Sequence, residues 1–259
     1  MKRILFMNLW LAVIILASAF LGASSIKGDC DADISGETCL SVSPVSSYGA
    51  TAQNQAPIDA VLSGRISHTT YTRGQTGKVT FNRFPATVEE FEQVREKIGG
   101  EPHGAVALQI MAFEMYRRDR TLGETCIRLN STLNNVNPAT SRLRELFGND
   151  AGYARPYQMA AFLKGATPQN GYKPTKPYII EVKVSDVRTY QNSNDYQTQV
   201  LCLNVLTNGK LSGSEIVEVL NTLKQDEPSE GKYFIVFNAP GLYSQVQAVS
   251  FANPFQGLE

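Results

Sequence analysis

Tyrosine and basic side chains concentrate between residues 153 and 178 of this chain, and their chemistry is that of a binding surface. Tyr and Arg are enriched at such surfaces because each buries a large area and keeps a polar end for hydrogen bonding. A ligand groove, if the chain has one, is therefore expected here, and its candidate residues are Tyr153, Arg155, Tyr157, Tyr172, Lys173 and Tyr178. The favoured interpretation is that the same rings fasten an irregular crossover of the chain onto its domain.

Residues suited to enzymatic catalysis are sparse. Of the two histidines, His68 falls in a Ser-, Gly- and Thr-rich segment, and His103 falls at the expected start of a helix. A Ser–His–Asp or Cys–His hydrolase would need His103 as its base, yet no G-x-S-x-G elbow accompanies it. A glycosidase-like hydrolase needs a pair of carboxyl groups, and the nearest candidates are Glu89, Glu90, Glu114 and Asp119. The sequence leaves enzymatic activity open and favours a protein without it.

One acidic segment near the N-terminus partly fits a calcium site. Asp31, Asp33 and Ser35 match the first half of a D-x-D-x-[DNS]-G loop. Such a loop is completed by a bidentate Glu at its twelfth position, where this chain has Val42. A solvated acidic segment is therefore the better interpretation, and a calcium site the weaker one. The sequence contains no glycine-rich phosphate loop of either common type, and we expect no cofactor.

The four cysteines allow two interpretations. Outside the cytoplasm an even number of cysteines favours disulfides. Cys30 and Cys39 would close a small loop, and Cys126 with Cys202 would tie a helix to a strand. The alternative for the second pair is two buried thiols, which pack like small apolar side chains. Without a CxxC motif or a Cys/His cluster, no zinc site is expected.

The N-terminus has the pattern of a secretory signal. Lys2 and Arg3 precede the mostly apolar run Ile4–Leu21, and small residues follow, so we expect cleavage of a signal peptide, 1–23, after Ala23. The alternative is an uncleaved anchor, because the apolar run is at the lower limit for spanning a bilayer. Either way the protein is expected to be secreted or at the cell surface, with no membrane contact beyond this segment.

The charge balance narrows the class of partner. The chain has 24 basic and 24 acidic residues, for a formal net charge of zero. A nucleic-acid binder would need a concentrated basic face, so nucleic acid is not an expected partner. The expected partner is an extracellular ligand or protein.

The remaining chain divides into a leader and one domain. Residues 24–76 are rich in Ser, Gly and Thr and show no sustained hydrophobic period, which predicts a flexible leader. Residues 77–259 are expected to form a single domain. Its central joint is Gly165–Tyr178, which reads GATPQNGYKPTKPY and contains too many helix breakers for a regular element to cross it.

Helices are expected before this joint, preceded by a short strand over residues 78–81, and strands are expected after it. Residues 88–98 have one apolar stripe behind a Thr87/Glu90 capping box, and residues 103–120 are apolar almost all round, as in a core helix. Weaker patterns predict helices over residues 122–133, 137–147 and 156–164, with Asn137 as an N-cap.

After the joint, Tyr178, Ile180, Val182 and Val184 alternate with more polar residues, which is typical of a half-buried strand. Further strands are expected near 201–205, 233–237 and 246–251. Ile216–Leu223 fits a strand or a helix, and its β-branched residues favour a strand. The predicted fold is α+β, with N-terminal helices packed on one face of a C-terminal antiparallel sheet. A curved, cone-like sheet of the nuclear transport factor and cystatin type is one compatible arrangement, and it implies no function.

The joint also carries a resemblance. Its pattern GATPxNGYxPxKPY, with the preceding Arg155-Pro156-Tyr157 and the later Gly231-Lys232-Tyr233, resembles an uncharacterised family of bacterial domains of unknown function, often secreted or membrane-anchored. The resemblance covers about residues 79–249. It implies a bacterial, extracytoplasmic single domain and brings no catalytic residue with it.

The sequence favours a non-enzymatic extracytoplasmic module that binds a ligand or a protein. The alternatives are a hydrolase of an envelope or extracellular polymer and a structural surface domain. A pocket in which titratable groups with perturbed pKa values converge would favour the hydrolase.

Overall fold

The computed structural model describes residues 56–66, 73–132, 135–149, 152–191, 197–221 and 232–250. The expected signal peptide, Cys30, Cys39 and the calcium half-loop of Asp31, Asp33 and Ser35 lie outside the described residues. Among the described helices, none combines the length and the hydropathy that a membrane span requires.

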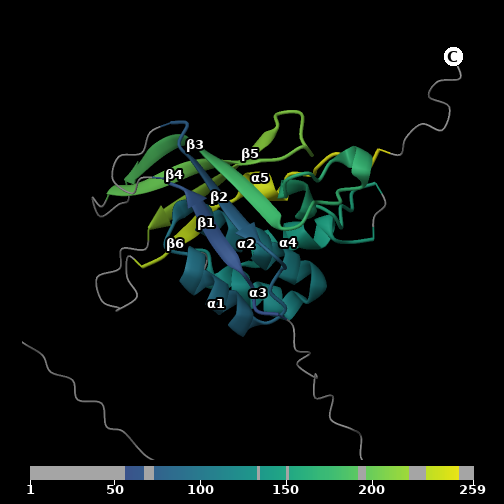
Figure 1. Ribbon diagram of the computed structural model, residues 1–259, viewed down its shortest axis with the longest axis horizontal. Helices are drawn as coiled ribbons and strands as arrows, with labels where there is room; N and C mark the ends of the chain where they lie inside the picture. Colours follow the sequence, from purple (N-terminus) through teal and green to yellow (C-terminus); the bar gives the residue numbers. More distant parts are fainter. Residues whose placement is uncertain are drawn as a thin grey trace, which may run out of the picture. The chain divides into compact units, whose positions relative to one another are not determined.

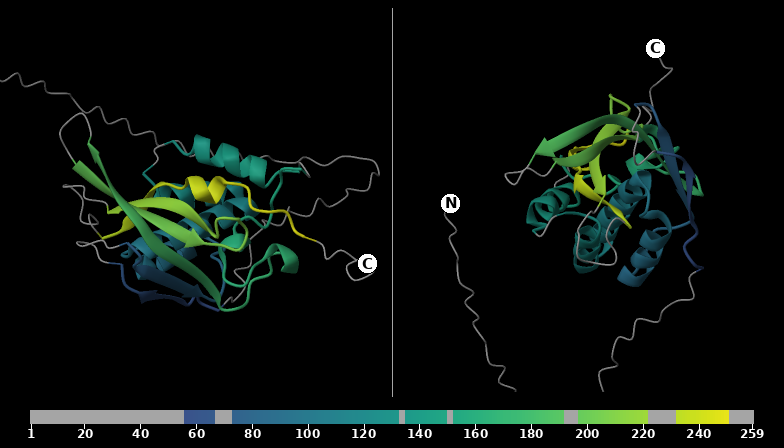
Figure 2. Two further views of the ribbon diagram at one scale, coloured as in Figure 1. Left: turned by 90° about the horizontal axis from the view of Figure 1, so that it is seen from above. Right: turned by 90° about the vertical axis from the view of Figure 1, so that its left-hand side faces the viewer.

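A six-stranded antiparallel sheet forms one layer of the domain, and it curls like half of a barrel (Figures 1 and 2). Each strand pairs with the next in the sequence. The strands are β1 (Ala60–Gly64), β2 (Thr76–Phe81), β3 (Tyr178–Gln191), β4 (Gln197–Leu206), β5 (Ser214–Asn221) and β6 (Phe234–Asn238).

The helices form the second layer, on one face of the sheet (Figure 2). The chain leaves the sheet after β2, makes all four of the longer helices, and returns to pair β3 beside β2. These helices are α1 (Val88–Ile98), α2 (Pro102–Arg118), α3 (Arg120–Leu129) and α4 (Asn137–Leu146). The predicted α+β class with a curved sheet is confirmed. Two strands precede the helices, of which β2 was expected over residues 78–81 and β1 was not.

Helix α2 is the centre of the core, as its sequence predicts. It is buried without a break from Pro102 to Tyr116 and contacts five of the six strands, β2 to β6. A helix that is apolar almost all round has no face suited to water, so it must be enclosed. The curled sheet covers one side of it, and α1, α3 and α4 pack against it as well.

The sheet begins earlier than the sequence indicates. Strand β1 lies within the segment 24–76, for which the sequence predicts a flexible leader, and contacts group Asn54–Glu259 into one unit. Side chains beyond β2 hold the residues just before β1. Asn82 bonds to Pro57 O and Asp59 N, and Arg83 Nε donates to Ala56 O over 2.9 Å. Such a strand is specified by distant partners, which a five-residue sequence pattern does not reveal.

Several local expectations are corrected. Thr87 Oγ1 caps α1 by accepting from Glu90 N, but the Glu90 carboxylate bonds to Ala86 N and Arg83 and completes no capping box. Asn137 is the first residue of α4, whose N-cap is Val136. The helix expected over 156–164 is reduced to a 3-10 turn, η1 (Ala160–Phe162). Residues 246–250 follow the short helix α5 (Pro240–Tyr243) and form no strand.

The ambiguous segment after residue 215 is a strand, as favoured. Val217 and Val219 of β5 face the core with Leu203 and Leu201 of β4 as their paired neighbours. That alternation is possible for a strand and not for a helix.

Candidate functional site

The joint between the helices and β3 is folded by its own side chains. The 3-10 turn η2 (Pro168–Asn170) has a reciprocal capping box, because Thr167 Oγ1 accepts from Asn170 N and Asn170 Oδ1 accepts from Thr167 N. Asn170 Nδ2 also donates to the carbonyls of Gly165 and Lys173. Gly171 follows with φ of +66°, a conformation that suits glycine.

Two of the predicted tyrosines meet beside this joint. The rings of Tyr157 and Tyr172 are stacked, with centroids 4.7 Å apart and planes 11° apart. The Tyr172 hydroxyl donates to Gln247 O over 2.8 Å, and the Tyr157 hydroxyl accepts from Val249 N over 3.2 Å. Both rings thus hold residues 244–250, which we call the strap.

A buried amide completes the hold on the strap. Gln158 is fully buried, and its Nε2 donates to Leu242 O and Ser244 O while its Oε1 accepts from Val246 N. Arg155 Nε donates to Val246 O over 3.0 Å. Sequence reasoning missed Gln158, and the available signal was a single polar residue inside the apolar run that surrounds it.

The other predicted residues do not join this group. Tyr178 starts β3 and packs against Phe81 and Phe84, with ring centroids 5.4 and 5.6 Å away. Lys173 is exposed and uses its backbone N–H to bond Asn170. Tyr153 contributes its carbonyl, which accepts from Gln245 Nε2. For Tyr157 and Tyr172, the interpretation as rings that fasten the crossover fits the geometry.

A shallow depression of about 470 Å³ opens beside the strap. Its cations are Arg155 and Lys210, and Leu211, which is 98% exposed, stands at its rim on the turn between β4 and β5. The rest of the lining is Ser212 of the same turn and three strap residues, Gln245, Val246 and Gln247. Sequence reasoning placed only Arg155 here, because nothing in the sequence brings the β4–β5 turn to this place.

The two cations of this depression differ in their pairing. Lys210 Nζ lies 3.4 Å from a carboxylate oxygen of Glu215. The Arg155 guanidinium bonds to the carbonyls of Val246, Gly152 and Ala154, and within the described residues no carboxylate pairs with it. Arg155 therefore keeps an unneutralised positive charge at the depression.

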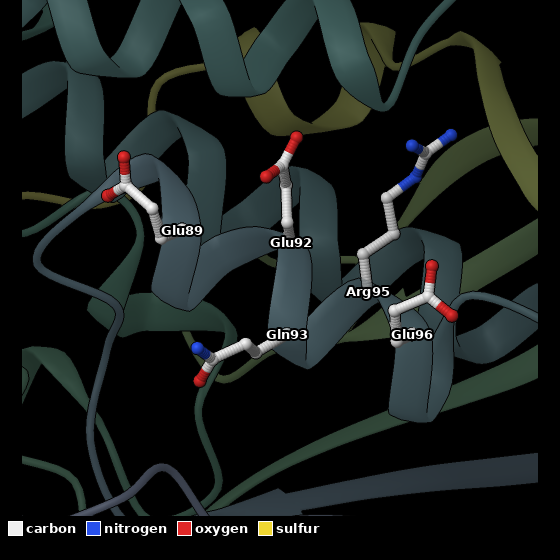
Figure 3. A pocket seen from close by; sticks show the side chains of 5 residues that line it. All are labelled: Glu89, Glu92, Gln93, Arg95 and Glu96. Carbon is white, nitrogen blue, oxygen red and sulfur yellow. The ribbon is translucent and has the colours of Figure 1, made fainter.

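A second depression, of about 480 Å³, lies along α1. Figure 3 shows Glu89, Glu92 and Arg95 extending to one side of the helix, with Gln93 pointing elsewhere. Arg95 stacks over the Tyr233 ring at 4.2 Å, and Glu96 accepts hydrogen bonds from Lys232 and Tyr233.

Electrostatics argue against an acid catalyst in this second depression. The backbone N–H of Glu89 and the Thr87 hydroxyl lower the pKa of the Glu89 carboxyl. Hydrogen bonds from Lys232 and Tyr233 lower the pKa of Glu96. A general acid needs a carboxyl whose pKa is raised, so both groups suit an acidic surface better than proton transfer.

The other residues considered for catalysis have structural partners. Glu114 binds Arg117 through two hydrogen bonds and Arg118 through a third. Asp119 caps α3 by accepting from Leu122 N. His103 is buried in α2, where its ring lies against the backbone of Gly77.

Cys126 and Cys202 are free, buried thiols, which is the second of the two interpretations left open. Cys126 Sγ lies 3.6 Å from Met115 Sδ, and Cys202 Sγ lies 3.8 Å from a Glu218 carboxylate oxygen. Among the residues that the structure describes, no three His, Cys, Asp or Glu side chains gather as metal ligands would.

A family model described as Domain of unknown function (DUF6935) matches residues 83–250. The chain belongs to the DUF6935 family. The DUF6935 match begins just after β2 and ends with the strap, so it includes the joint, Gln158 and both depressions. The predicted resemblance to an uncharacterised domain family is confirmed at that level. Neither a curated protein nor a solved structure matches the chain.

Proposed function

We propose that this DUF6935 domain is a non-enzymatic extracytoplasmic binding module, and that its ligand binds at the depression beside the strap. The observation that carries the proposal is the position of Arg155. Its guanidinium is held by carbonyl oxygens, with no carboxylate partner among the described residues, and it lines a depression open to solvent. A fixed, unneutralised cation at such a place favours an anionic ligand group.

The surroundings of Arg155 indicate a peptide or protein ligand. Leu211 offers an almost fully exposed apolar side chain at the rim. A carboxylate next to an apolar side chain would complement this pair, and both an acidic residue and a chain terminus supply one. The extracytoplasmic location is an expectation from the N-terminal sequence of Lys2, Arg3 and the apolar run Ile4–Leu21.

The polymer hydrolase receives less support. Its candidate carboxylates Glu90 and Glu114 are engaged by arginines, and the pKa of Glu90 is lowered by its hydrogen bonds from Arg83. The structural surface domain is the alternative that a binding experiment must separate from a binding module.

The test is a thermal-shift screen of the whole protein with short peptides that place a carboxylate beside an apolar residue. Each peptide is paired with an amidated copy, which lacks the terminal charge. A ligand that binds only the folded state raises the melting temperature as its concentration rises. We expect shifts that the amidated copies fail to give.

Variants locate the site. Leu211→Ser should abolish the shift without changing the unliganded melting temperature, because Leu211 is 98% exposed. The matched control is Val61→Ser, an exposed apolar residue of β1 at 53%. A shift that survives Leu211→Ser and Arg155→Gln would place binding elsewhere. Absence of any shift would favour the structural surface domain.

A further inference from the structure

The strap is held through its main chain. Val246 and Gln247 each use both backbone groups, and the partners include Gln158, Arg155 and the carbonyl of Gly209. Farther along, Val249 N donates to the Tyr157 hydroxyl and Ser250 N donates to Pro168 O. Main-chain hydrogen bonds combined with pockets for a few side chains are how proteins bind extended peptides. The residues that hold the strap, which we call the strap groove, thus contact it in the way that proteins contact a bound extended peptide.

Side chains of the strap add two apolar contacts. Val246 is buried, and Val249 packs partly buried against the core. The strap therefore fits the groove by its backbone and by these two valines.

Emptying the strap groove would lower the stability of the domain. The buried Gln158 amide makes three hydrogen bonds to this region, and two of them go to strap residues, Ser244 and Val246. A buried polar group that loses its partners loses its compensation for desolvation. Some occupant of the strap groove is therefore favoured at all times.

Within the described residues, the strap is joined to the rest of the domain through α5. Residues 240–243 form α5, which stays anchored by the buried Leu242 and by Tyr243, whose ring lies 5.1 Å from that of Phe113. The strap follows α5 and belongs to no strand of the sheet. It can leave its groove from Ser244 onward without breaking a strand pairing.

We propose that the strap groove also accepts the strap of a second copy of this chain, so that two copies exchange straps reciprocally. The occupant with the right chemistry is already seated in the groove, and a second copy reproduces every hydrogen bond in trans. Exchange of an identical element is a low-cost route to a symmetric dimer. The chain's own strap competes with an effective concentration on the order of millimolar, so exchange in the unaltered protein occurs at comparably high protein concentration.

Complementary variants test this exchange. Gln158→Leu damages the groove and leaves the strap intact, whereas Val246→Asp damages the strap and leaves the groove intact. We expect each variant alone to be monomeric at micromolar concentration. When mixed, the strap of the first should seat in the groove of the second, and native mass spectrometry should detect a one-to-one heterodimer. Mixing Val246→Asp with a copy that carries both substitutions is the matched control, and no heterodimer is expected there.

A peptide arm guards against variants that fail to fold, which circular dichroism would reveal. A synthetic peptide of residues 244–250 should raise the melting temperature of Val246→Asp by about 3 °C or more at saturation. The same peptide with Asp at its third position should not. If Gln158→Leu does not fold, this peptide arm decides the test, because it needs only Val246→Asp to fold.

The outcomes are decisive in both directions. Folded variants that give neither a heterodimer nor a peptide shift would overturn the proposal. A heterodimer that also forms with the doubly substituted copy would overturn it too, because the contact would then lie outside the strap groove. The strap peptides are amidated at their C-terminus, so this test involves neither Leu211 nor an added carboxylate ligand, and its result is separate from that of the proposed binding site.

Discussion

The stacked rings of Tyr157 and Tyr172 bind one stretch of backbone through opposite hydrogen-bonding roles. The Tyr172 hydroxyl donates to Gln247 O, and the Tyr157 hydroxyl accepts from Val249 N two residues farther on. The two hydroxyls of one ring pair therefore bind a backbone carbonyl and a backbone N–H of the same segment. This arrangement links the joint at residue 172 to the last described residues of the domain.

Removing one hydroxyl of this pair should loosen the strap and keep the stack. Tyr172→Phe deletes the donor to Gln247 O, so we expect a loss of about 1 kcal/mol in the free energy of unfolding. For a domain of this size that lowers the melting temperature by about 2–4 °C. Thermal denaturation measures it, with Tyr153→Phe as the control, since that hydroxyl has no hydrogen bond to any residue that the structure describes. Equal effects of both substitutions would contradict the assignment.

Alkaline pH should weaken the same contact. Burial raises the pKa of Tyr172 to about 12 from an ordinary value of 10.0. A raised pKa means that the folded state holds the proton more tightly, so its contribution is fully present below pH 10 and is lost as the pH rises towards 12. The melting temperature should therefore fall more steeply between pH 10 and 11.5 in the unaltered protein than in Tyr172→Phe. Parallel curves for the two proteins would refute this.

Close packing of β2 on α2 depends on the absence of a side chain at residue 77. A Cβ on Gly77 would lie 2.5 Å from Cγ of the buried His103 ring. Gly77→Ala should therefore cost about 1–3 kcal/mol in the free energy of unfolding, as overpacked core positions do. Gly100→Ala is the control, because its Cβ would meet only Lys232 O at 3.5 Å. Chemical denaturation compares the two variants. Similar denaturation midpoints for both would show that the His103 ring moves aside without cost.

The Cys126 thiol should be inert in the folded protein. Burial raises its pKa to about 12, so almost none of the nucleophilic thiolate is present at pH 8. We expect a maleimide reagent to label Cys126 only after denaturation, with or without prior reduction. Peptide mapping by mass spectrometry makes the measurement. Labelling that requires a reductant would reveal a disulfide and contradict the free thiol.

The sequence predicted those parts of the fold whose pattern is long and local. Helices α1 and α2 and strands β3 to β5 were found because a periodic run of apolar residues reports burial directly. Strand β1 was missed because five residues carry too little pattern. The strand expected over residues 246–251 is not formed by residues 246–250, where Val246 is buried and Val249 partly buried by contacts that involve no neighbouring strand.

The candidate site was predicted less completely, for a related reason. Tyr157 and Tyr172 were found together because both flank the joint. Tyr178 was grouped with them by sequence distance, yet it belongs to β3, whose pairing with β2 turns its ring towards Phe81. Lys210 and Leu211 reach the depression from a turn more than fifty residues after Arg155. Only tertiary structure brings that turn to Arg155.

The insertion of all the longer helices between β2 and β3 sets the order in which the chain can fold. Strand β2 can pair with β1 at once, but its other edge pairs with β3, as Thr76 does with Lys183. In a chain emerging N-terminus first, that edge has no partner until more than a hundred residues have followed it. Over that interval α2 is complete but lacks the strands β3 to β6 that cover it. Long-range pairings of this kind form slowly and expose apolar surface meanwhile. We therefore expect nascent chains to expose the apolar surface of α2 until β3 has emerged.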